Sequence, residues 1–307
     1  MFKRECAVLD PKQLEALSAV VECGGFDKAA RKLFLTQSAI SQRIRQLEEN
    51  LGQPVLTRTS PPAPTISGRL LLRHYQQLCL MEGELRNTLQ PDAEDSSFTT
   101  LTVGVNADSL ATWFLPAVQS VMQQRRLLID VMMDDQDYTH ELMRSGHVVG
   151  CIGTRPTPIQ GGECHFLGSM RYLCLATPDF AARYFADGFT PAALAQAPAI
   201  IFSGKDDLHS EFLQQFAAYE GSTPHLTLPT PQGFVQATRL GLAYSLLPEL
   251  MIDDDLHTGR LINLLPGQYV DLPLYWHHWR VESSLAQSLS EALLQHAAQV
   301  LRQPATA

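Results

Sequence analysis

TQSAISQRIRQLEENLGQP, residues 36–54, predicts a helix with two chemically different faces. Four apolar residues recur on one stripe at helical spacing: Ile40, Ile44, Leu47 and Leu51. Thr36 is a good N-cap, Gly52 suits the position just past the helix, and Pro54 prevents its continuation. The opposite face carries Gln, Ser and Arg in place of the usual mixture of Glu and Lys.

Two shorter helices are predicted before this one. The stretch DPKQLEALSAVVECGG, residues 10–25, begins with Asp10 as N-cap and Pro11 at the first helical position, where proline's missing N–H costs nothing. The stretch FDKAARKLF, residues 26–34, also has its apolar residues at helical spacing. Two short helices, a tight turn and a third helix fit a helix-turn-helix unit. The following VLTRTSPPAPTISG, residues 55–68, predicts a short strand and a proline-rich wing.

The polar face of the third helix has the chemistry needed to read base pairs. A recognition helix points its first turns into the major groove, where Arg pairs with guanine, Gln with adenine and Ser with either. The candidate DNA contacts on this helix are Thr36, Gln37, Ser38, Ser41, Gln42 and Arg45. The candidate phosphate contacts are Arg31, Lys32, Arg43 and Arg58. The alternative is a solvated face on an ordinary three-helix cap.

Charge is distributed unevenly along the 307 residues. Residues 1–69 contain ten Lys and Arg against seven Asp and Glu, a balance of +3, so the rest of the chain carries −9 − 3 = −12. A basic N-terminal part followed by an acidic remainder indicates that residues 1–69, and not the rest of the chain, bind a polyanionic partner.

Compartment signals favour a cytoplasmic protein. The six cysteines are scattered without a C-x-x-C pair, and a chain of this size needs no disulfide staples, so we expect reduced thiols. The first residues, MFKRECAVLDPK, lack the apolar segment of a signal peptide. No run of about 18 apolar residues is found, so no membrane contact is expected.

Changes of pattern predict the domain organisation. Residues 1–65 form the expected winged helix-turn-helix domain, and 66–97 form a linker and hinge whose long helix, at about 66–89, needs a partner for its apolar stripe. From residue 98 to 307 strands and helices alternate, which predicts parallel α/β sheets. We expect two lobes in this effector-binding domain, lobe I at about 98–164 and 276–307 and lobe II at about 165–275. The helix at 108–124 is expected to kink near Pro116.

The stretch FDKAARKLFLTQSAISQRIRQLEENLGQPVLTR, residues 26–58, resembles the N-terminal signature of the LysR-type transcriptional regulators. The resemblance covers the whole chain. It implies an α/β fold class with an N-terminal all-α winged helix-turn-helix, a long linker helix and a two-lobed, periplasmic-binding-protein-like effector domain. It also implies a homodimer or homotetramer that binds double-stranded promoter DNA and a small effector, with RNA polymerase as a further partner. One departure is the proline-rich wing at 61–64, which leaves Arg58 a larger share of the wing charge.

Further motifs resemble the ArgP/LysG (IciA-type) branch of that family. They are VNADSLATW at 105–113, SGHVVG at 145–150, FVQ at 234–236 and LYWH at 274–277. This resemblance implies a basic amino-acid effector, lysine or arginine, and control of amino-acid export or metabolism genes.

Ligands of such open α/β folds bind outside the carboxyl ends of the strands. Ser109 or Asp108 would lie at a helix N-terminus there, which favours an anion such as a carboxylate; the alternative is a plain N-cap. Asp134 and Asp135 follow the next strand and suit an ammonium or guanidinium group, with a solvated acidic loop as the alternative.

Four more residues are candidates at the same cleft. Asp206 and Asp207 offer carboxylates from the second lobe, although a helix cap is the favoured interpretation there. Thr154 follows the strand at 148–153 and is placed to contact backbone groups of a ligand. Arg171 lies near the crossover between lobes, where it would either repel a basic ligand or bind its carboxylate.

No catalytic site, metal site or cofactor is expected. His277 and His278 are adjacent on a predicted strand and so point to opposite faces, and no Cys/His set of zinc spacing accompanies them. An α/β enzyme is disfavoured because the chain has no G-x-S-x-G, no P-loop and no G-x-G-x-x-G after a strand. The remaining alternative is a solute-binding transport protein with the same two-lobed domain, against which the DNA-binding unit and the missing signal peptide argue.

Overall fold

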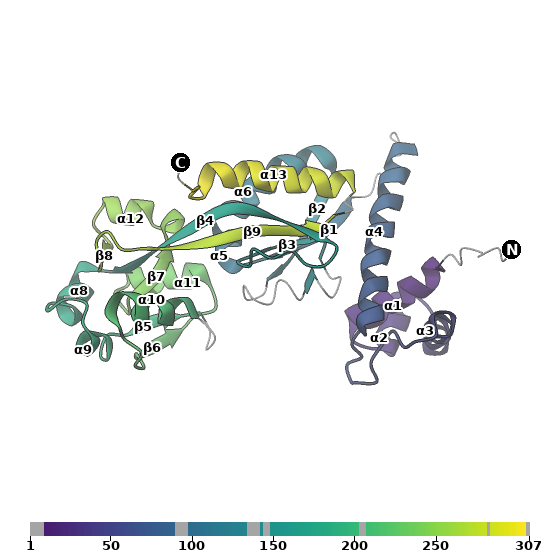
Figure 1. Cartoon of the computed structure of the whole chain (residues 1–307), viewed down its shortest axis with the longest axis horizontal. Helices are drawn as coiled ribbons and strands as arrows, with labels where there is room; N and C mark the ends of the chain where they lie inside the picture. Colours follow the sequence, from purple (N-terminus) through teal and green to yellow (C-terminus); the bar gives the residue numbers. More distant parts are fainter. Residues whose placement is uncertain are drawn as a thin grey trace.

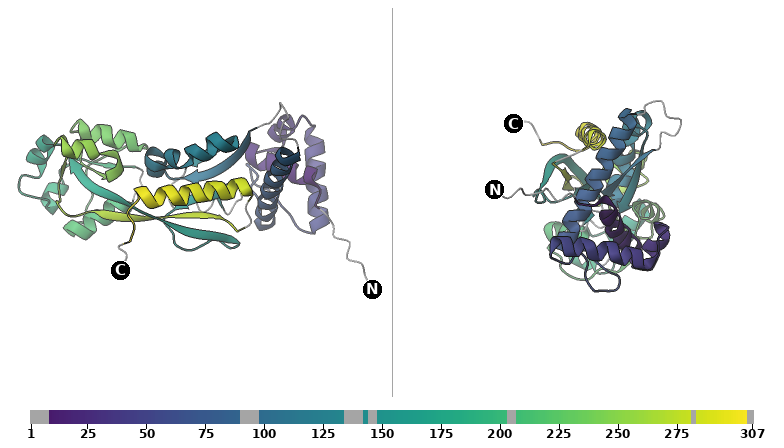
Figure 2. Two further views of the ribbon diagram at one scale, coloured as in Figure 1. Left: turned by 90° about the horizontal axis from the view of Figure 1, so that it is seen from above. Right: turned by 90° about the vertical axis from the view of Figure 1, so that its right-hand side faces the viewer.

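The computed structural model describes residues 9–89, 98–133, 142–143, 148–202, 207–280 and 283–304. A helical N-terminal unit and the two lobes of an α/β unit follow one another along the long axis (Figures 1 and 2). This arrangement confirms the predicted fold class, a winged helix-turn-helix joined through a long helix to a two-lobed α/β domain.

The N-terminal unit contains α1 (Pro11–Cys23), α2 (Phe26–Lys32) and α3 (Gln37–Leu51). The predicted caps are confirmed: the Asp10 carboxylate accepts a hydrogen bond from the Lys12 amide at 2.9 Å, and the Thr36 hydroxyl accepts one from the Ala39 amide at 3.2 Å. A shared core fixes the three helices to one another. Its central buried side chains are Leu14, Leu17, Val20, Ala29, Ala30, Ile40, Ile44 and Leu47.

The wing after α3 is shorter than its sequence predicts. Leu56 and Pro64 form a single antiparallel bridge, and the Thr57 amide donates to the Ala63 carbonyl at 2.7 Å. The predicted strand is therefore reduced to one bridge, because prolines lack the N–H groups that a longer ladder needs.

The long helix α4 (Ile66–Leu89) has the predicted bounds. Its first turns pack on the N-terminal unit, where Leu71 and Leu72 are buried. Farther along its length, Leu85 and Leu89 remain 58% and 71% exposed, so the chain by itself covers only the base of the predicted apolar stripe.

One mixed sheet runs through both lobes in the order β2-β1-β3-β9-β4-β7, with β8 paired to β4. Its strands are β1 (Thr99–Val105), β2 (Leu127–Met133), β3 (Gly150–Gly153), β4 (Gly162–Ala176), β7 (Ser245–Pro248), β8 (Ile262–Asn263) and β9 (Val270–Trp279). Strand β1 runs parallel to β2 and β3, whereas β9 is antiparallel to β3 and β4. The predicted parallel pairing is confirmed for β1 with its two neighbours, but the sheet as a whole is mixed, because the chain returns from lobe II along β9 and this strand enters the sheet in the opposite direction.

Strands β4 and β9 lie side by side across both lobes (Figure 1). Strand β4 is 15 residues long, and its pairing with β9 shifts register once, between Phe166 and Gly168. These two long strands therefore carry the chain from lobe I to lobe II and back.

The helix predicted at 108–124 is divided into three pieces: α5 (Ala107–Ser109), a π-helical turn η1 (Leu110–Phe114) and α6 (Leu115–Arg125). The predicted irregularity near Pro116 is confirmed, since Pro116 lies in the first turn of α6 directly after the π turn. On the same side of lobe I, α13 (Ser284–Val300) packs against α6 (Figure 2).

Lobe II adds β5 (Ala199–Ile201) and β6 (His225–Thr227), which pair in parallel. Its helices are α8 (Pro178–Tyr184), α9 (Pro191–Leu194), α10 (Asp207–Ala217), α11 (Pro231–Arg239), η2 (Glu249–Met251) and α12 (Asp253–His257). Within the described residues none of the five cysteines forms a disulfide, and no helix is long and apolar enough to cross a bilayer.

Candidate functional site

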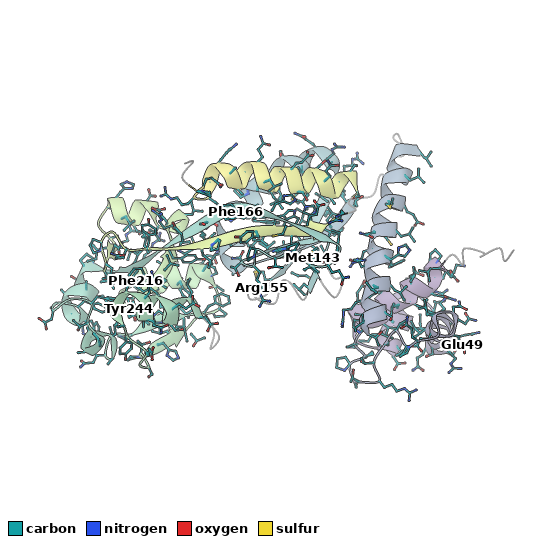
Figure 3. All side chains as sticks on the ribbon, viewed as in Figure 1. Glu49, Met143, Arg155, Phe166, Phe216 and Tyr244 are labelled. Carbon is teal, nitrogen blue, oxygen red and sulfur yellow. The ribbon has the colours of Figure 1, made fainter. Side chains whose placement is uncertain are left out.

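The predicted base-reading residues share the outer face of α3. Gln37, Ser38, Gln42 and Arg45 are exposed and Ser41 is half-buried, while Ile40, Ile44 and Leu47 face the core. The same stripe continues to Glu49, whose side chain lies on the outer side of α3 in Figure 3. A carboxylate there repels phosphate, which limits the surface suited to DNA to the first turns of the helix.

The predicted phosphate contacts differ in how available they are. Arg31 and Arg58 are exposed, on α2 and in the wing. Lys32 forms an ion pair with Glu22, and this hydrogen bond raises the pKa of Lys32. Arg43 donates to the Lys12 carbonyl at 3.4 Å and lies 3.5 Å from the Glu15 carboxylate, so its guanidinium ties α3 to α1.

The structure adds a residue that the sequence patterns did not reveal. Phe34, in the turn between α2 and α3, is 95% exposed with φ 54°. A large apolar side chain held out beside the N-terminus of α3 suits contact with thymine methyl groups. The only signal in the sequence is an aromatic residue inside a turn, and such a residue is as consistent with a buried core position as with an exposed one.

At the carboxyl end of β1, Asn106 is the most unusual polar residue of the effector domain. Its side chain is 3% exposed, and neither of its amide atoms, Oδ1 or Nδ2, meets a hydrogen-bond partner within the described residues. It occupies the N-cap position of α5 yet forms no side-chain cap. A buried amide without partners costs about 1–3 kcal/mol, which makes Asn106 a candidate for binding a polar group of a ligand.

The two predicted residues that follow have definite contacts. Asp108 is half-buried, and its carboxylate accepts a 2.7 Å hydrogen bond from the Tyr172 hydroxyl of β4. Ser109 is fully buried and its hydroxyl accepts a 3.1 Å hydrogen bond from the Trp113 indole. Asp108 is therefore held by β4, whereas Ser109 is held by the π turn that follows it.

The other predicted cleft residues are only partly described. Thr154 is half-buried directly after β3, the strand beside β1. Asp207 is exposed at the start of α10. Asp134, Asp135 and Asp206 lie outside the described residues.

Arg171 already has an anionic partner. Its guanidinium donates two hydrogen bonds of 2.8 Å to the Asp271 carboxylate, one strand across in β9, and stacks 3.4 Å from the centre of the Tyr269 ring. The hydrogen bonds to Asp271 raise the pKa of Arg171. The charge that was expected to repel or bind the ligand is thus balanced by Asp271 at the crossing strands.

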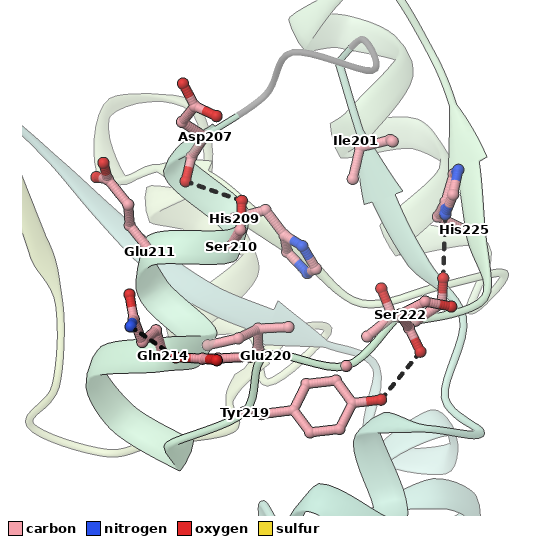
Figure 4. Close-up of a pocket in the computed structure, with 13 residues that line it drawn as sticks. Ile201, Asp207, His209, Ser210, Glu211, Gln214, Tyr219, Glu220, Ser222 and His225 are labelled. Carbon is pink, nitrogen blue, oxygen red and sulfur yellow. Dashed lines mark hydrogen bonds between the residues drawn. The ribbon is translucent and has the colours of Figure 1, made fainter.

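A pocket of about 470 Å³ lies elsewhere, in lobe II (Figure 4). It is lined by α10, the turn at 219–223 and the start of β6, and no residue of lobe I reaches it. Inside it, His209 lies 3.1 Å from the Tyr244 hydroxyl, and burial together with nearby His225 lowers the pKa of His209 to about 4. Among the predicted cleft residues that the structure describes, only Asp207 lines this pocket, and Asp108, Ser109 and Thr154 do not.

Comparison with known families identifies both halves of the chain. Residues 11–69 match the model described as "Bacterial regulatory helix-turn-helix protein, lysR family", and residues 95–298 match "LysR substrate binding domain". The HTH-type transcriptional regulator ArgP of Pseudomonas aeruginosa strain UCBPP-PA14 is 46% identical over 290 residues, which cover 94% of this chain and 96% of that protein.

Solved structures give the same result. The crystal structure of ArgP from Mycobacterium tuberculosis has a TM-score of 0.84 at 35% identity, covering 97% of this chain and 100% of that chain. Full-length LysG from Corynebacterium glutamicum with bound effector Arg has a TM-score of 0.79 at 32% identity, covering 96% of this chain and 100% of that chain. Both similarities extend over the DNA-binding and the effector-binding parts.

Proposed function

Because the chain belongs to the lysR family of bacterial regulatory helix-turn-helix proteins, we propose that it senses a basic amino acid, arginine or lysine, and changes its promoter binding in response. As a LysR-type protein it is a DNA-binding transcriptional regulator with an amino-acid effector, and not an enzyme. The more specific proposals are the residues at each site, the identity of the effector and the genes controlled.

The DNA-reading role is assigned to the first turns of α3. Gln37, Ser38, Gln42 and Arg45 are exposed on one face, and the Thr36 cap holds the helix start that enters the major groove. Ser41 completes that face, while Arg31, Lys32 and Arg58 supply phosphate contacts from its two sides. Lys32 must exchange Glu22 for phosphate to do so.

The effector role rests on one observation above all: the buried amide of Asn106, which has no partner within the described residues. An amide offers two donors and an acceptor, so it can bind both the α-carboxylate and the α-ammonium group that every amino acid carries. Beside it, Asp108 is held by Tyr172 and supplies the negative charge that a basic side chain requires.

The remaining cleft residues are proposed in supporting roles. Thr154 is placed to contact the ligand backbone, and Ser109 keeps the turn that carries Asp108 in position. Asp134, Asp135 and Asp206 are proposed as further carboxylates for an ammonium or guanidinium group. The structure of LysG with bound Arg, at 32% identity, supports a basic effector for this chain.

The wider assignment completes the proposal. The chain is proposed to act in the cytoplasm as a homodimer or homotetramer, to control genes of amino-acid export or metabolism, and to contact RNA polymerase at its promoters. The ArgP relative, at 46% identity over nearly its whole length, supports this assignment.

Calorimetric titration of the full chain with arginine, lysine, glutamine and alanine tests the effector assignment. We expect saturable binding of arginine or lysine, and a loss of about 10- to 100-fold in that affinity for Asn106→Ala, as for a hydrogen bond to a charged group. Asn50→Ala, an exposed change at the end of α3, is the matched control. If Asn106→Ala binds the basic amino acid with unchanged affinity, Asn106 is not part of the effector site. If alanine binds as tightly as arginine, the effector site has no preference for a basic side chain.

A further inference from the structure

Strands β4 and β9 bring three metal-binding side chains onto one face of lobe I. Glu163 is the register partner of His278, and His165 lies two residues along β4 from Glu163, so all three point the same way. One ligand atom from each lies within 4.8 Å of the other two.

We propose that Glu163, His165 and His278 form a binding site for a divalent transition-metal ion of the zinc class. Two imidazole nitrogens and one carboxylate oxygen are a ligand set that Zn²⁺ accepts, with the fourth position open to water. Hard cations such as Ca²⁺ and Mg²⁺ prefer oxygen ligands, so two imidazoles select against them.

The spacing of the groups is close to that of a loaded site. Ligand atoms around a tetrahedral Zn²⁺ lie about 3.4 Å apart, and the His165 Nε2 atom is already 3.6 Å from the Glu163 carboxylate. The two imidazole rings are stacked, 9° from parallel with centroids 5.1 Å apart, so one of them must turn before both ring nitrogens can point at one ion. The side chains of His165 and Glu163 are 43% and 41% exposed, so small rotations bring them onto an ion without moving the core.

The most buried of the three ligands is oriented as in known metal sites. His278 is 6% exposed, and its Nδ1 lies 3.0 Å from the Trp279 carbonyl. A backbone acceptor on one ring nitrogen fixes the tautomer and places the lone pair on the other, Nε2. Arg280, 3.4 Å from the second carboxylate oxygen of Glu163, fixes that side chain from the solvent side.

The simpler interpretation is a surface ion pair between Glu163 and protonated His165. In that interpretation His278 is held by its contacts with the Trp279 carbonyl and the Trp276 ring. What favours a metal site is that this second imidazole lies beside the first, on the face that Glu163 shares. The cluster could not be predicted from the sequence. His277 and His278 point to opposite faces of β9, as predicted, and the two side chains beside His278, Glu163 and His165, come from the neighbouring strand β4.

The test uses the full chain stripped of metal by a chelator, with the exposed thiol Cys79 replaced by Ser in every variant to remove a competing ligand. Zn²⁺ is titrated in competition with a chromophoric chelator. Co²⁺ is titrated in parallel, followed by its visible absorption and by quenching of Trp276, whose ring lies 6.3 Å from His278. The site variants are Glu163→Gln and His165→Ala, and the control is His257→Ala, an exposed histidine on α12.

We expect the wild-type chain to bind one Zn²⁺ ion at this site. The affinity for that ion should fall on the order of 100-fold in each site variant and stay unchanged in His257→Ala. Thermal unfolding without metal should be the same in all variants, since the changed side chains are partly exposed. The proposal is overturned if the chain with Glu163, His165 and His278 intact shows no saturable binding of Zn²⁺. It is also overturned if Glu163→Gln and His165→Ala bind Zn²⁺ with the same affinity as His257→Ala.

Discussion

Arg45 carries the sharpest test of the DNA-reading face at the scale of single residues. It is exposed at the third turn of α3 and makes no packing contribution to the helical core. We expect Arg45→Ala to lose about 1–3 kcal/mol of discrimination between its promoter and random DNA, because a bidentate contact to guanine is removed. Footprinting and equilibrium binding measure the change.

The matched control for this prediction is Arg183→Ala, which removes the same charge from an exposed position on α8 in lobe II. It should leave the footprint intact. If Arg45→Ala protects the same bases with the same affinity as Arg183→Ala, the base-reading assignment of Arg45 is wrong.

His209 makes the stability of lobe II depend on pH. Its folded-state pKa is lowered to about 4, chiefly by burial, whereas the unfolded chain takes up the proton near pH 6.5. Below pH 6.5 the unfolded state therefore binds more protons, and stability falls as the pH is lowered from 6.5 towards 4. The full effect is about 3 kcal/mol.

We expect His209→Gln to flatten this decline, since glutamine can keep a hydrogen bond to Tyr244 without titrating. Unfolding at a series of pH values between 7 and 4 measures it, with His257→Gln on an exposed position as control. A decline of the same slope in His209→Gln and wild type would show that other groups cause the acid sensitivity.

At the scale of elements, the contact between α4 and the wing depends on a glycine. A Cβ added to Gly68 would lie 2.1 Å from the Val55 carbonyl oxygen and 3.2 Å from Pro64. Gly68→Ala must therefore push the start of the linker helix away from the wing. We expect a loss of about 1–3 kcal/mol in stability and weaker promoter binding.

Gly83, in the same helix, provides the control. The nearest atom to an added Cβ there is 4.0 Å away, so Gly83→Ala should stabilise α4 by up to about 1 kcal/mol through helix propensity. Thermal unfolding measures the stability of both variants, Gly68→Ala and Gly83→Ala. Equal effects of the two substitutions would contradict the close approach at Gly68.

The helices also show which features a sequence can predict. The caps at Asp10 and Thr36 and the bounds of α4 depend on neighbouring residues, and they were predicted correctly. The direction of β9 and the continuity of β4 depend on pairing between residues about 100 positions apart, which local patterns do not contain. For the same reason the partner of Arg171, Asp271, was not foreseen.

At the scale of the whole molecule, the sequence was sufficient to predict the fold and the family. It predicted only some of the candidate effector contacts. The motif VNADSL directed attention to Asp108 and Ser109, but the decisive property of Asn106 is a buried amide without partners, and burial is invisible in the sequence. The carboxylates Asp134, Asp135 and Asp206 stay predictions, as do the exact limits of the domains.

In the whole molecule, the proposed DNA-reading helix lies in the N-terminal unit and the proposed effector residues lie directly after β1 in lobe I. Between them, the Arg73 guanidinium of α4 lies 4.7 Å from the Trp279 ring at the end of β9, so the linker helix contacts lobe I directly. Strands β9 and β4 continue from this contact to the crossing point at Arg171 and Asp271. The linker helix is therefore in contact with the strand pair that runs through both lobes.

The most direct test of the central claim is the binding of the full chain to a promoter duplex, first selected from genomic fragments by the wild-type protein, with and without arginine or lysine. We expect one of these amino acids, but not alanine, to change the affinity or the footprint, and Asn106→Ala to abolish the change while still binding the duplex. A promoter affinity and footprint that neither basic amino acid alters at saturating concentration would contradict the proposal that a basic effector controls DNA binding.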